Sequence, residues 1–432
     1  MFYTLENQWQ KELCSKSYIN PLKKPHNYHN FLNTEKMALL KTTTKTLLYI
    51  VFSIFFKSFH ASITYNVVDF GADPNGQKDS TDAFHSAWSK VCTSLGSATL
   101  LVPQGTFLLQ MTKFEGPCQS KTISIEISGS LVAPTDYTML GSDNPWIQIN
   151  GVDGISISGG TIDGKGKNLW DCKNSEQNCP KGSTSLGISN SNNIKISSLT
   201  LADSQMFHMK IVSCQNVVLE EIKALAPEDS PNTDGIHIQE SSFVSIYRST
   251  MSTGDDCVSI GPGSSNLWIE DITCGPGHGI SIGSLGNNVE DGGVQNVTVT
   301  MASFSGTKNG FRIKTWGKPS HAIVKHVTFQ HATINNVHNP IIIDQNYCPD
   351  KSKGCINQPS GVQINGITFS DIHGSSATKD AIKFECSSMK PCYGLILENI
   401  NLNYDGEPAE TLCANAFGKT LGIVNPPGCL KS

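Results

Sequence analysis

Residues 194–199 read Ile-Lys-Ile-Ser-Ser-Leu and residues 217–222 read Val-Val-Leu-Glu-Glu-Ile, with apolar side chains at positions i, i+2 and i+5. The pattern recurs as Ile155/Ile157, Val244/Ile246, Leu267/Ile269/Ile272, Val297/Val299, Ala322/Val324/Val327, Val362/Ile364/Ile367 and Leu395/Leu397/Ile400. Successive starts from residue 194 to residue 322 are 23, 27, 23, 30 and 25 residues apart. Alternation with period two predicts strands, and no helical period separates them. We therefore expect an all-β fold, a right-handed parallel β-helix of about ten coils with one repeat per coil.

A second set of strands lies between these repeats. Its members are Gly235-Ile236-His237-Ile238, Cys257-Val258-Ser259-Ile260, Gly279-Ile280-Ser281-Ile282, Phe311-Arg312-Ile313-Lys314 and Pro340-Ile341-Ile342-Ile343. Apolar positions are expected to fill the solenoid, and the intervening side chains to point outward. An open solenoid end needs a cap. The apolar stripe of residues 79–92 (Ala83, Phe84, Ala87, Trp88 and Val91), with Asp79 and Ser80 as N-cap candidates, predicts a short N-terminal capping helix.

Composition narrows the class of protein. Of 432 residues, 16% are charged, against a typical value of about 25%, and the net charge is −5. This composition excludes a coiled coil, a helical bundle and charged disorder, and it indicates no nucleic-acid partner. Only two arginines occur, Arg248 and Arg312, so each is expected to have a specific role.

The start of the chain predicts secretion. The apolar run 46–56 is shorter than the roughly 20 residues that span a bilayer, so no stable membrane insertion is expected. Lys41 and Lys45 precede it, and Ala61 and Ser62 follow it, which is the layout of a signal peptide at residues 37–61. A short buried helix is the alternative. Residues 1–36 are then an extension upstream of the true start. Residues 62–432 form a single β-helix domain, expected to be an extracellular monomer.

The cysteines fit an oxidising compartment. Proximity in sequence suggests the pairs Cys92–Cys118, Cys172–Cys179, Cys257–Cys274, Cys348–Cys355, Cys386–Cys392 and Cys413–Cys429. Of the 14 cysteines, Cys14 lies in the segment 1–36, and Cys214 is left over within a strand-like run, where it is expected to be buried and reduced. Connectivity is not fixed by sequence. Zinc is the rival interpretation, but no CxxC pair occurs. One glycosylation sequon, Asn296-Val297-Thr298, is consistent with secretion.

Three carboxylates and an imidazole are spaced by one coil. Asp234 and Asp255 are 21 residues apart, and Asp256 and His278 are 22 residues apart. Residues one coil apart become neighbours in a β-helix, so these side chains should line up on one face. Two carboxyls flanking a glycosidic bond are the minimal apparatus for its hydrolysis, and mutual repulsion should keep at least one protonated. Asp234 alone fits an ordinary turn, His278 alone a structural role, and the cluster could instead bind calcium.

A pair of cations follows on the same predicted face. Arg312 and Lys314 are separated by the inward-pointing Ile313. A solvated surface pair is one interpretation. Beside a carboxylate cleft, an anionic ligand is the better one, because Arg offers a planar fork for a carboxylate. Tyr347, one further coil along, either stacks on a sugar or covers the core.

At these residues the sequence resembles the plant polygalacturonases, the pectin-hydrolysing glycosidases of the β-helix class. The matching segments are 64–72 in part (Asn66-Val67-Val68-Asp69-Phe70-Gly71-Ala72), Ser230-Pro231-Asn232-Thr233-Asp234-Gly235, Gly254-Asp255-Asp256-Cys257, the run 274–286 that contains Gly277-His278-Gly279, and Arg312-Ile313-Lys314-Thr315-Trp316. The resemblance covers roughly residues 64–430. The extra segment 1–36 is the main departure from the family.

The resemblance implies inverting hydrolysis of α-1,4 bonds in polygalacturonate, in the cell wall and without a cofactor or metal. It makes Asp255 the proton donor, while Asp234 and Asp256 position and deprotonate the attacking water. It makes His278 the support of the acid. It implies that Arg312 and Lys314 hold galacturonate carboxylates, that Tyr347 lines the adjoining subsite, and that Asn232 is a further contact.

Three alternatives stay open at this point. A related hydrolase could act on another pectic backbone such as rhamnogalacturonan. A calcium-dependent pectate lyase also uses a β-helix. A non-catalytic pectin-binding solenoid is the third, although three carboxylates in a cleft disfavour polyanion binding alone. Endo attack is weakly favoured over exo.

Overall fold

The computed structural model describes residues 62–432 apart from 142–143, 176–177, 350–353 and 357. The predictions of an extension at 1–36 and a signal peptide at 37–61 lie outside these residues. No helix in the described ranges is both long and apolar enough to cross a membrane.

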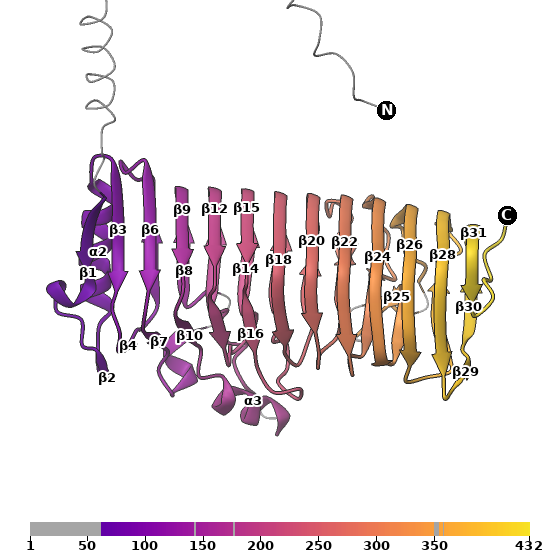
Figure 1. The fold of residues 1–432 in the computed structure, drawn as a ribbon, viewed down its shortest axis with the longest axis horizontal. Helices are drawn as coiled ribbons and strands as arrows, with labels where there is room; N and C mark the ends of the chain where they lie inside the picture. Colours follow the sequence, from indigo (N-terminus) through magenta and orange to yellow (C-terminus); the bar gives the residue numbers. More distant parts are fainter. Residues whose placement is uncertain (1–61, 142–143, 176–177, 350–353, 357) are drawn as a thin grey trace, which may run out of the picture. The chain divides into compact units, whose positions relative to one another are not determined.

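The described strands form two stacks that follow the chain in order (Figure 1). The first, sheet B, has 11 strands. They are β5 (Thr112–Glu115), β8 (Ile147–Asn150), β11 (Leu186–Ser189), β14 (Met209–Val212), β17 (Ile236–Gln239), β19 (Val258–Ile260), β21 (Ile280–Leu285), β23 (Asn309–Trp316), β25 (Asn339–Tyr347), β27 (Asp380–Glu385) and β30 (Glu410–Ala414).

The second stack, sheet A, has 20 strands. They are β1 (Ile63–Asn66), β2 (Asn75–Asp79), β3 (Ser97–Val102), β4 (Thr106–Leu108), β6 (Thr122–Ile127), β7 (Ser130–Val132), β9 (Asp153–Ser158), β10 (Thr161–Asp163), β12 (Asn192–Ser197), β13 (Thr200–Ala202), β15 (Gln215–Glu220), β16 (Lys223–Leu225), β18 (Ser242–Ser252), β20 (Ser265–Cys274), β22 (Val294–Ser305), β24 (Ile323–Val337), β26 (Gln363–Ser376), β28 (Cys392–Tyr404), β29 (Glu407–Pro408) and β31 (Ala416–Asn425).

The register confirms the repeat. Val217 pairs with Val244, which pairs with Leu267 on the next strand, and all three are buried. Each coil thus stacks equivalent apolar residues on those of its neighbours, and the pairing is parallel everywhere among the described strands except between β28 and β29. Parallel crossovers within one sheet are right-handed. The molecule is the predicted right-handed parallel β-helix.

The first coils carry the predicted cap. Helix α2 (Thr81–Thr93) buries the whole predicted stripe, from Ala83 to Val91. Asp79 Oδ1 accepts hydrogen bonds from the backbone N–H and the hydroxyl of Thr81, so Asp79 provides the side-chain cap and Ser80 does not. Within the described residues, the other helical segments are the 3-10 turns η1 (Val67–Phe70) and η2 (Tyr137–Leu140) and helix α3 (Lys167–Asn174).

Disulfides fasten the solenoid in all six predicted pairs. Cys214 is buried and reduced, as expected, and burial raises the pKa of its thiol. Since burial favours the protonated thiol over the thiolate, Cys214 acts as a small apolar core residue.

Candidate functional site

The site is built on one outward-facing row of sheet B. The register aligns His237, Ser259, Ser281 and Arg312 across β17, β19, β21 and β23. The residues flanking each of them in its strand are buried and apolar. Strand alternation therefore places four polar side chains on the same face of consecutive coils.

The predicted aspartates and the predicted histidine lie in the turns just before these strands. Asp234 is two residues before β17, Asp256 two before β19, and His278 two before β21. This common offset is the reason that residues about one coil apart in sequence meet in space. Gly254 is required at the turn, because a Cβ there would come within 2.0 Å of the Ser230 carbonyl oxygen.

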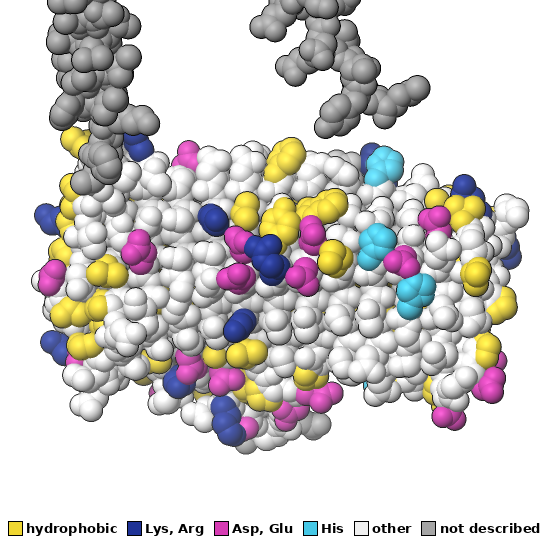
Figure 2. Space-filling model, viewed as in Figure 1, with side chains coloured by type: hydrophobic (Ala, Val, Ile, Leu, Met, Phe, Trp, Pro, Cys, Tyr) yellow, Lys and Arg dark blue, Asp and Glu magenta, His cyan; other side chains and the backbone are white. Residues whose placement is uncertain are grey.

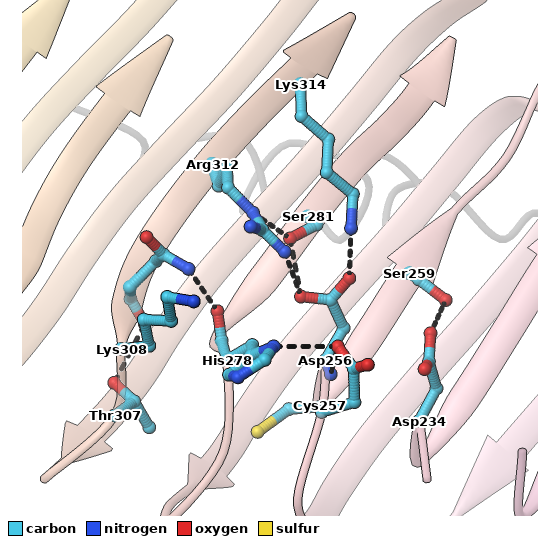
Figure 3. Close-up of polar contacts among 12 residues, drawn as sticks. Asp234, Asp256, Cys257, Ser259, His278, Ser281, Thr307, Lys308, Arg312 and Lys314 are labelled. Atoms are coloured by element: carbon cyan, nitrogen blue, oxygen red, sulfur yellow. Dashed lines mark hydrogen bonds and ion pairs between the residues drawn. The ribbon is translucent and has the colours of Figure 1, made fainter. Parts of the chain in front are cut away.

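Asp256 is held as a buried carboxylate (Figure 3). Its Oδ1 accepts from Arg312 Nη2 at 2.7 Å and from Ser281 Oγ at 2.8 Å, and its Oδ2 accepts from Lys314 Nζ at 2.8 Å. Burial alone would raise the pKa of this carboxyl. The two cations outweigh burial and lower the pKa to about 2, so Asp256 is ionised throughout the physiological range.

Asp234 has the opposite environment. It is buried, and Ser259 Oγ donates to its Oδ2 at 2.6 Å. Burial, followed by repulsion from Asp255 and Asp256, raises its pKa well above the usual value. Asp234 is therefore the carboxyl of the cluster whose environment most favours the protonated form.

A histidine stands behind Ser259. His237 Nδ1 is 2.8 Å from Ser259 Oγ, and because that hydroxyl gives its proton to Asp234, His237 is the donor. Burial, and then the charge of Lys210, lower the pKa of His237 to about 4. A neutral imidazole, protonated on Nδ1, therefore orients the hydroxyl that contacts Asp234.

Asp255 is the accessible carboxyl of the three. Its Oδ1 is 2.8 Å from His278 Nδ1 and also accepts the backbone N–H of Asp256 at 2.9 Å. Its side chain is 19% exposed, against 2% for Asp256. A cavity of about 460 Å³ lies alongside, and its lining includes Gly254, His278, Lys308, His338, Asn339 and Thr378. A ligand in this cavity would contact His278, the partner of Asp255, although none of the three carboxyls is among the lining residues.

The predicted substrate-binding residues all lie near the acidic cluster, but they make different contacts. Arg312 and Lys314, expected to face a substrate anion, both contact Asp256. Tyr347 is half-buried, with the Lys314 ammonium 5.5 Å from its ring centroid and the Trp316 ring at 5.4 Å. Asn232 is exposed in a left-handed conformation two residues before Asp234. Tyr347 thus adjoins the cations, and Asn232 shares the turn of the cluster.

Four residues of the site were not singled out from the sequence. They are Ser259 and Ser281, which bond the two buried carboxyls, His237, and Lys308, which Figure 3 shows beside His278. The sequence contained a pattern that could have identified three of them, because His237, Ser259 and Ser281 are each the polar residue between two apolar residues in the second strand set. Polar residues at outward positions of the strands before Arg312 could therefore have been predicted to join the same site.

A metal ion is the remaining use for such a cluster. Asp255, Asp256 and His278 bring ligand atoms within 4.8 Å of one another. However, both oxygens of Asp256 already pair with protein cations, and Asp255 Oδ1 pairs with His278. Calcium needs six to eight oxygen ligands, which this arrangement of cations and imidazole does not offer.

Comparisons with known proteins agree with this chemistry. The family model described as Glycosyl hydrolases family 28 matches residues 92–421. A polygalacturonase of Prunus persica is 53% identical over 369 residues, which cover 85% of this chain and 94% of that protein. An exopolygalacturonase of Platanus acerifolia is 39% identical, covering 81% of this chain and 93% of its own.

Solved structures share the fold. The endo-xylogalacturonan hydrolase from Aspergillus tubingensis superposes with a TM-score of 0.74 and 26% identity, over 84% of this chain and 99% of its own. Endopolygalacturonase I from Stereum purpureum superposes with a TM-score of 0.59 at 22% identity, covering 79% of this chain and 98% of its own.

Proposed function

The chain belongs to the glycosyl hydrolases of family 28 and hydrolyses polygalacturonate, and from this premise we propose how its own residues divide the work. Inverting hydrolysis needs one carboxyl that protonates the leaving oxygen and one carboxylate that deprotonates water on the opposite side. One observation carries the assignment: Asp255 is partly exposed and contacts His278, whereas the adjacent Asp256 is buried and paired with two cations.

Asp255 is the proton donor. It is the accessible carboxyl of the three, and its partner His278 lines the cavity. The raised pKa of Asp234 favours retention of a proton within the cluster. In our assignment Asp255 delivers a proton to the leaving oxygen, because Asp234 is buried behind it.

Asp256 and Asp234 activate the water. Two cations keep Asp256 ionised, which a base requires. Asp234 is oriented by Ser259 and His237, so it can fix the position of the water between the two carboxyls. Arg312 and Lys314 combine this role with binding of the substrate carboxylate at the cleavage site.

The cavity extends the site along the stack. Its lining residues come from successive turns, from Gly254 through Lys308 and His338 to Thr378. Lys308 is an exposed cation at this wall and is suited to a second galacturonate carboxylate. A binding surface that crosses several coils accommodates a polymer, and we favour endo attack for this reason. Tyr347 and Asn232 are further contacts of the sugars.

Secretion to the cell wall is part of the proposal. Six disulfides require an oxidising compartment, and the substrate is a wall polymer. The N-terminal capping helix supports a monomer, and the acidic balance disfavours nucleic acid.

The experiment compares two substrates in two single variants. Polygalacturonate has a poor leaving group that needs an acid, whereas α-galacturonosyl fluoride needs very little protonation. In Asp255→Asn we expect kcat on polygalacturonate to fall about 10²–10⁴-fold and kcat on the fluoride to fall far less. In Asp256→Asn both should fall, because both reactions need the base.

The same two substrates would also show whether Asp255 has been wrongly assigned as the proton donor. Equal losses on both substrates in Asp255→Asn would remove the acid role from that residue. If Asp234→Asn instead spared only the fluoride, the acid would be Asp234, in line with its raised pKa.

A further inference from the structure

A row of left-handed residues runs along sheet A, one per coil. Asn193, Asn216, Phe243, Asn266 and Asn296 all have φ between 56° and 57°. Asn216 Nδ2 donates to Asn193 Oδ1 at 3.2 Å, and Asn296 Nδ2 donates to Asn266 Oδ1. The amide ladder is broken in the middle by Phe243.

Phe243 is out of place by two criteria. A bulky residue in the left-handed region is an outlier, whereas asparagine tolerates that conformation. Its side chain is also 58% exposed. Met301, His326 and His331 adopt the same backbone conformation, so it is the exposed aromatic side chain within a row of asparagines that suggests a surface role.

A second exposed aromatic residue lies on the next coil. Trp268 is 41% exposed and is fixed by a hydrogen bond from its Nε1 to Glu270 Oε2 at 2.7 Å. Figure 2 shows hydrophobic side chains gathered near the middle of this face. The catalytic residues lie on sheet B and its turns, so this patch is separate from the site of hydrolysis.

The glycosylation sequon lies on the following coil. Asn296 pairs in the ladder with Asn266, and Thr298 is directly opposite Trp268 in the register. With about 4.8 Å between coils and about 3.3 Å per residue, the Cα atoms of Asn296 and Trp268 are about 8 Å apart. Phe243 is two coils from Asn296 in the same row, at about 10 Å.

We propose that Asn296 is N-glycosylated and that the first sugars of the glycan lie over Trp268 and Phe243. The C–H face of a hexose is apolar, so packing it on an indole or phenyl ring removes both from water. The charges beside the rings are mixed, because Glu220 pairs with Arg248 and Lys195 while Glu270 accepts from Trp268, so the patch offers no net cationic surface to a polyanionic galacturonan. The glycan thus accounts for two aromatic side chains that the solenoid otherwise leaves exposed.

The modification is an ordinary group transfer. Asn296 Nδ2 attacks C1 of N-acetylglucosamine on a lipid-linked diphosphate oligosaccharide. The C1–O bond to the diphosphate breaks, the N–C1 bond forms, and the amide loses one proton. The remaining N–H of Nδ2 can still donate to Asn266. The reaction requires passage through the secretory pathway, which the proposed function includes.

The test uses the full chain from residue 62, secreted from yeast behind a host signal peptide, so that a failure of the native leader is not confused with a failure of this proposal. Intact mass is compared before and after endoglycosidase H. Wild type and the matched control Thr298→Ser should carry a glycan, whereas Asn296→Gln and Thr298→Ala should not. Unglycosylated secreted wild type would overturn the proposed modification.

Contact with the aromatic residues has its own readout. Loss of the glycan through Thr298→Ala should lower Tm by about 1–2 °C when Trp268 is present. In a Trp268→Ser background, Thr298→Ala should leave Tm unaltered. The control Thr298→Ser, which keeps the glycan, should leave Tm unaltered both with Trp268 and with Ser at that position. An equal decrease in both backgrounds would show that the glycan does not pack on Trp268.

Discussion

Replacement of Lys314 by methionine should move the acid limb of the pH profile. Lys314 Nζ is 2.8 Å from Asp256 Oδ2, and methionine keeps much of the side-chain volume without the charge. A pair of charges at this distance is worth about 6 kcal/mol at an effective dielectric constant of about 20, or roughly four pH units. Relaxation and water entry reduce this figure, so we expect a shift of at least about two pH units.

The direction of the shift follows from the charge of the active form of Asp256. Removing a cation destabilises the Asp256 carboxylate and raises its pKa from the value of about 2 that it has with both cations. Because the base acts when ionised, activity in Lys314→Met should be lost at a higher pH than in wild type as the pH falls.

The assay is kcat/KM on oligogalacturonate by reducing-end release between pH 2.5 and 6. Loss of a substrate contact lowers the whole profile, whereas loss of the ion pair moves its midpoint, so the two effects of Lys314 separate. Lys314→Arg keeps a cation and should restore the midpoint. Because an Asp256 pKa of about 2 puts the wild-type midpoint below this range, a Lys314→Met profile with no midpoint between pH 2.5 and 6 would refute the reasoning.

Three further changes test other parts of the structure. His237→Phe removes the donor behind the hydroxyl that orients Asp234, so kcat should fall about tenfold and the alkaline limb should move to higher pH, because a weaker hydrogen bond to its carboxylate raises the pKa of Asp234; a lower kcat with an unmoved limb would indicate only a packing role. Gly254→Ala places a Cβ within 2.0 Å of a backbone oxygen, and both activity and Tm should fall, as activity and differential scanning fluorimetry can show; a normal Tm would contradict this close approach. Replacing Cys413 and Cys429 with serine opens a loop of 16 residues, which should lower the free energy of unfolding by about 3 kcal/mol in urea denaturation, whereas an unchanged midpoint would mean that the pair is dispensable.

The fold was readable because each coil repeats one simple pattern. Val217, Val244 and Leu267 were aligned by their spacing alone, and the register pairs them. The one-coil spacing also predicted that the aspartates and His278 line up on one face, and His278 Nδ1 lies 2.8 Å from Asp255 Oδ1, since a solenoid converts sequence offsets into neighbours.

The side-chain partners were harder to predict. Arg312 was expected to face a substrate anion, but it reaches back to Asp256, which is 56 residues earlier in the sequence. A pattern of alternation says that Arg312 points outward, but not in which direction along the stack it extends. For the same reason the sequence predicted a protonated carboxyl without identifying it, because the pKa of Asp234 depends on burial and on distances to its neighbours.

Hydrolysis itself is tested most directly on de-esterified polygalacturonate at about pH 5, with and without EDTA, while reducing ends, ultraviolet absorbance and viscosity are followed together. The structure predicts EDTA-resistant release of reducing ends, no new absorbance and a fast fall in viscosity. No release, or release that requires calcium and produces ultraviolet absorbance, would contradict acid–base hydrolysis by this carboxylate cluster.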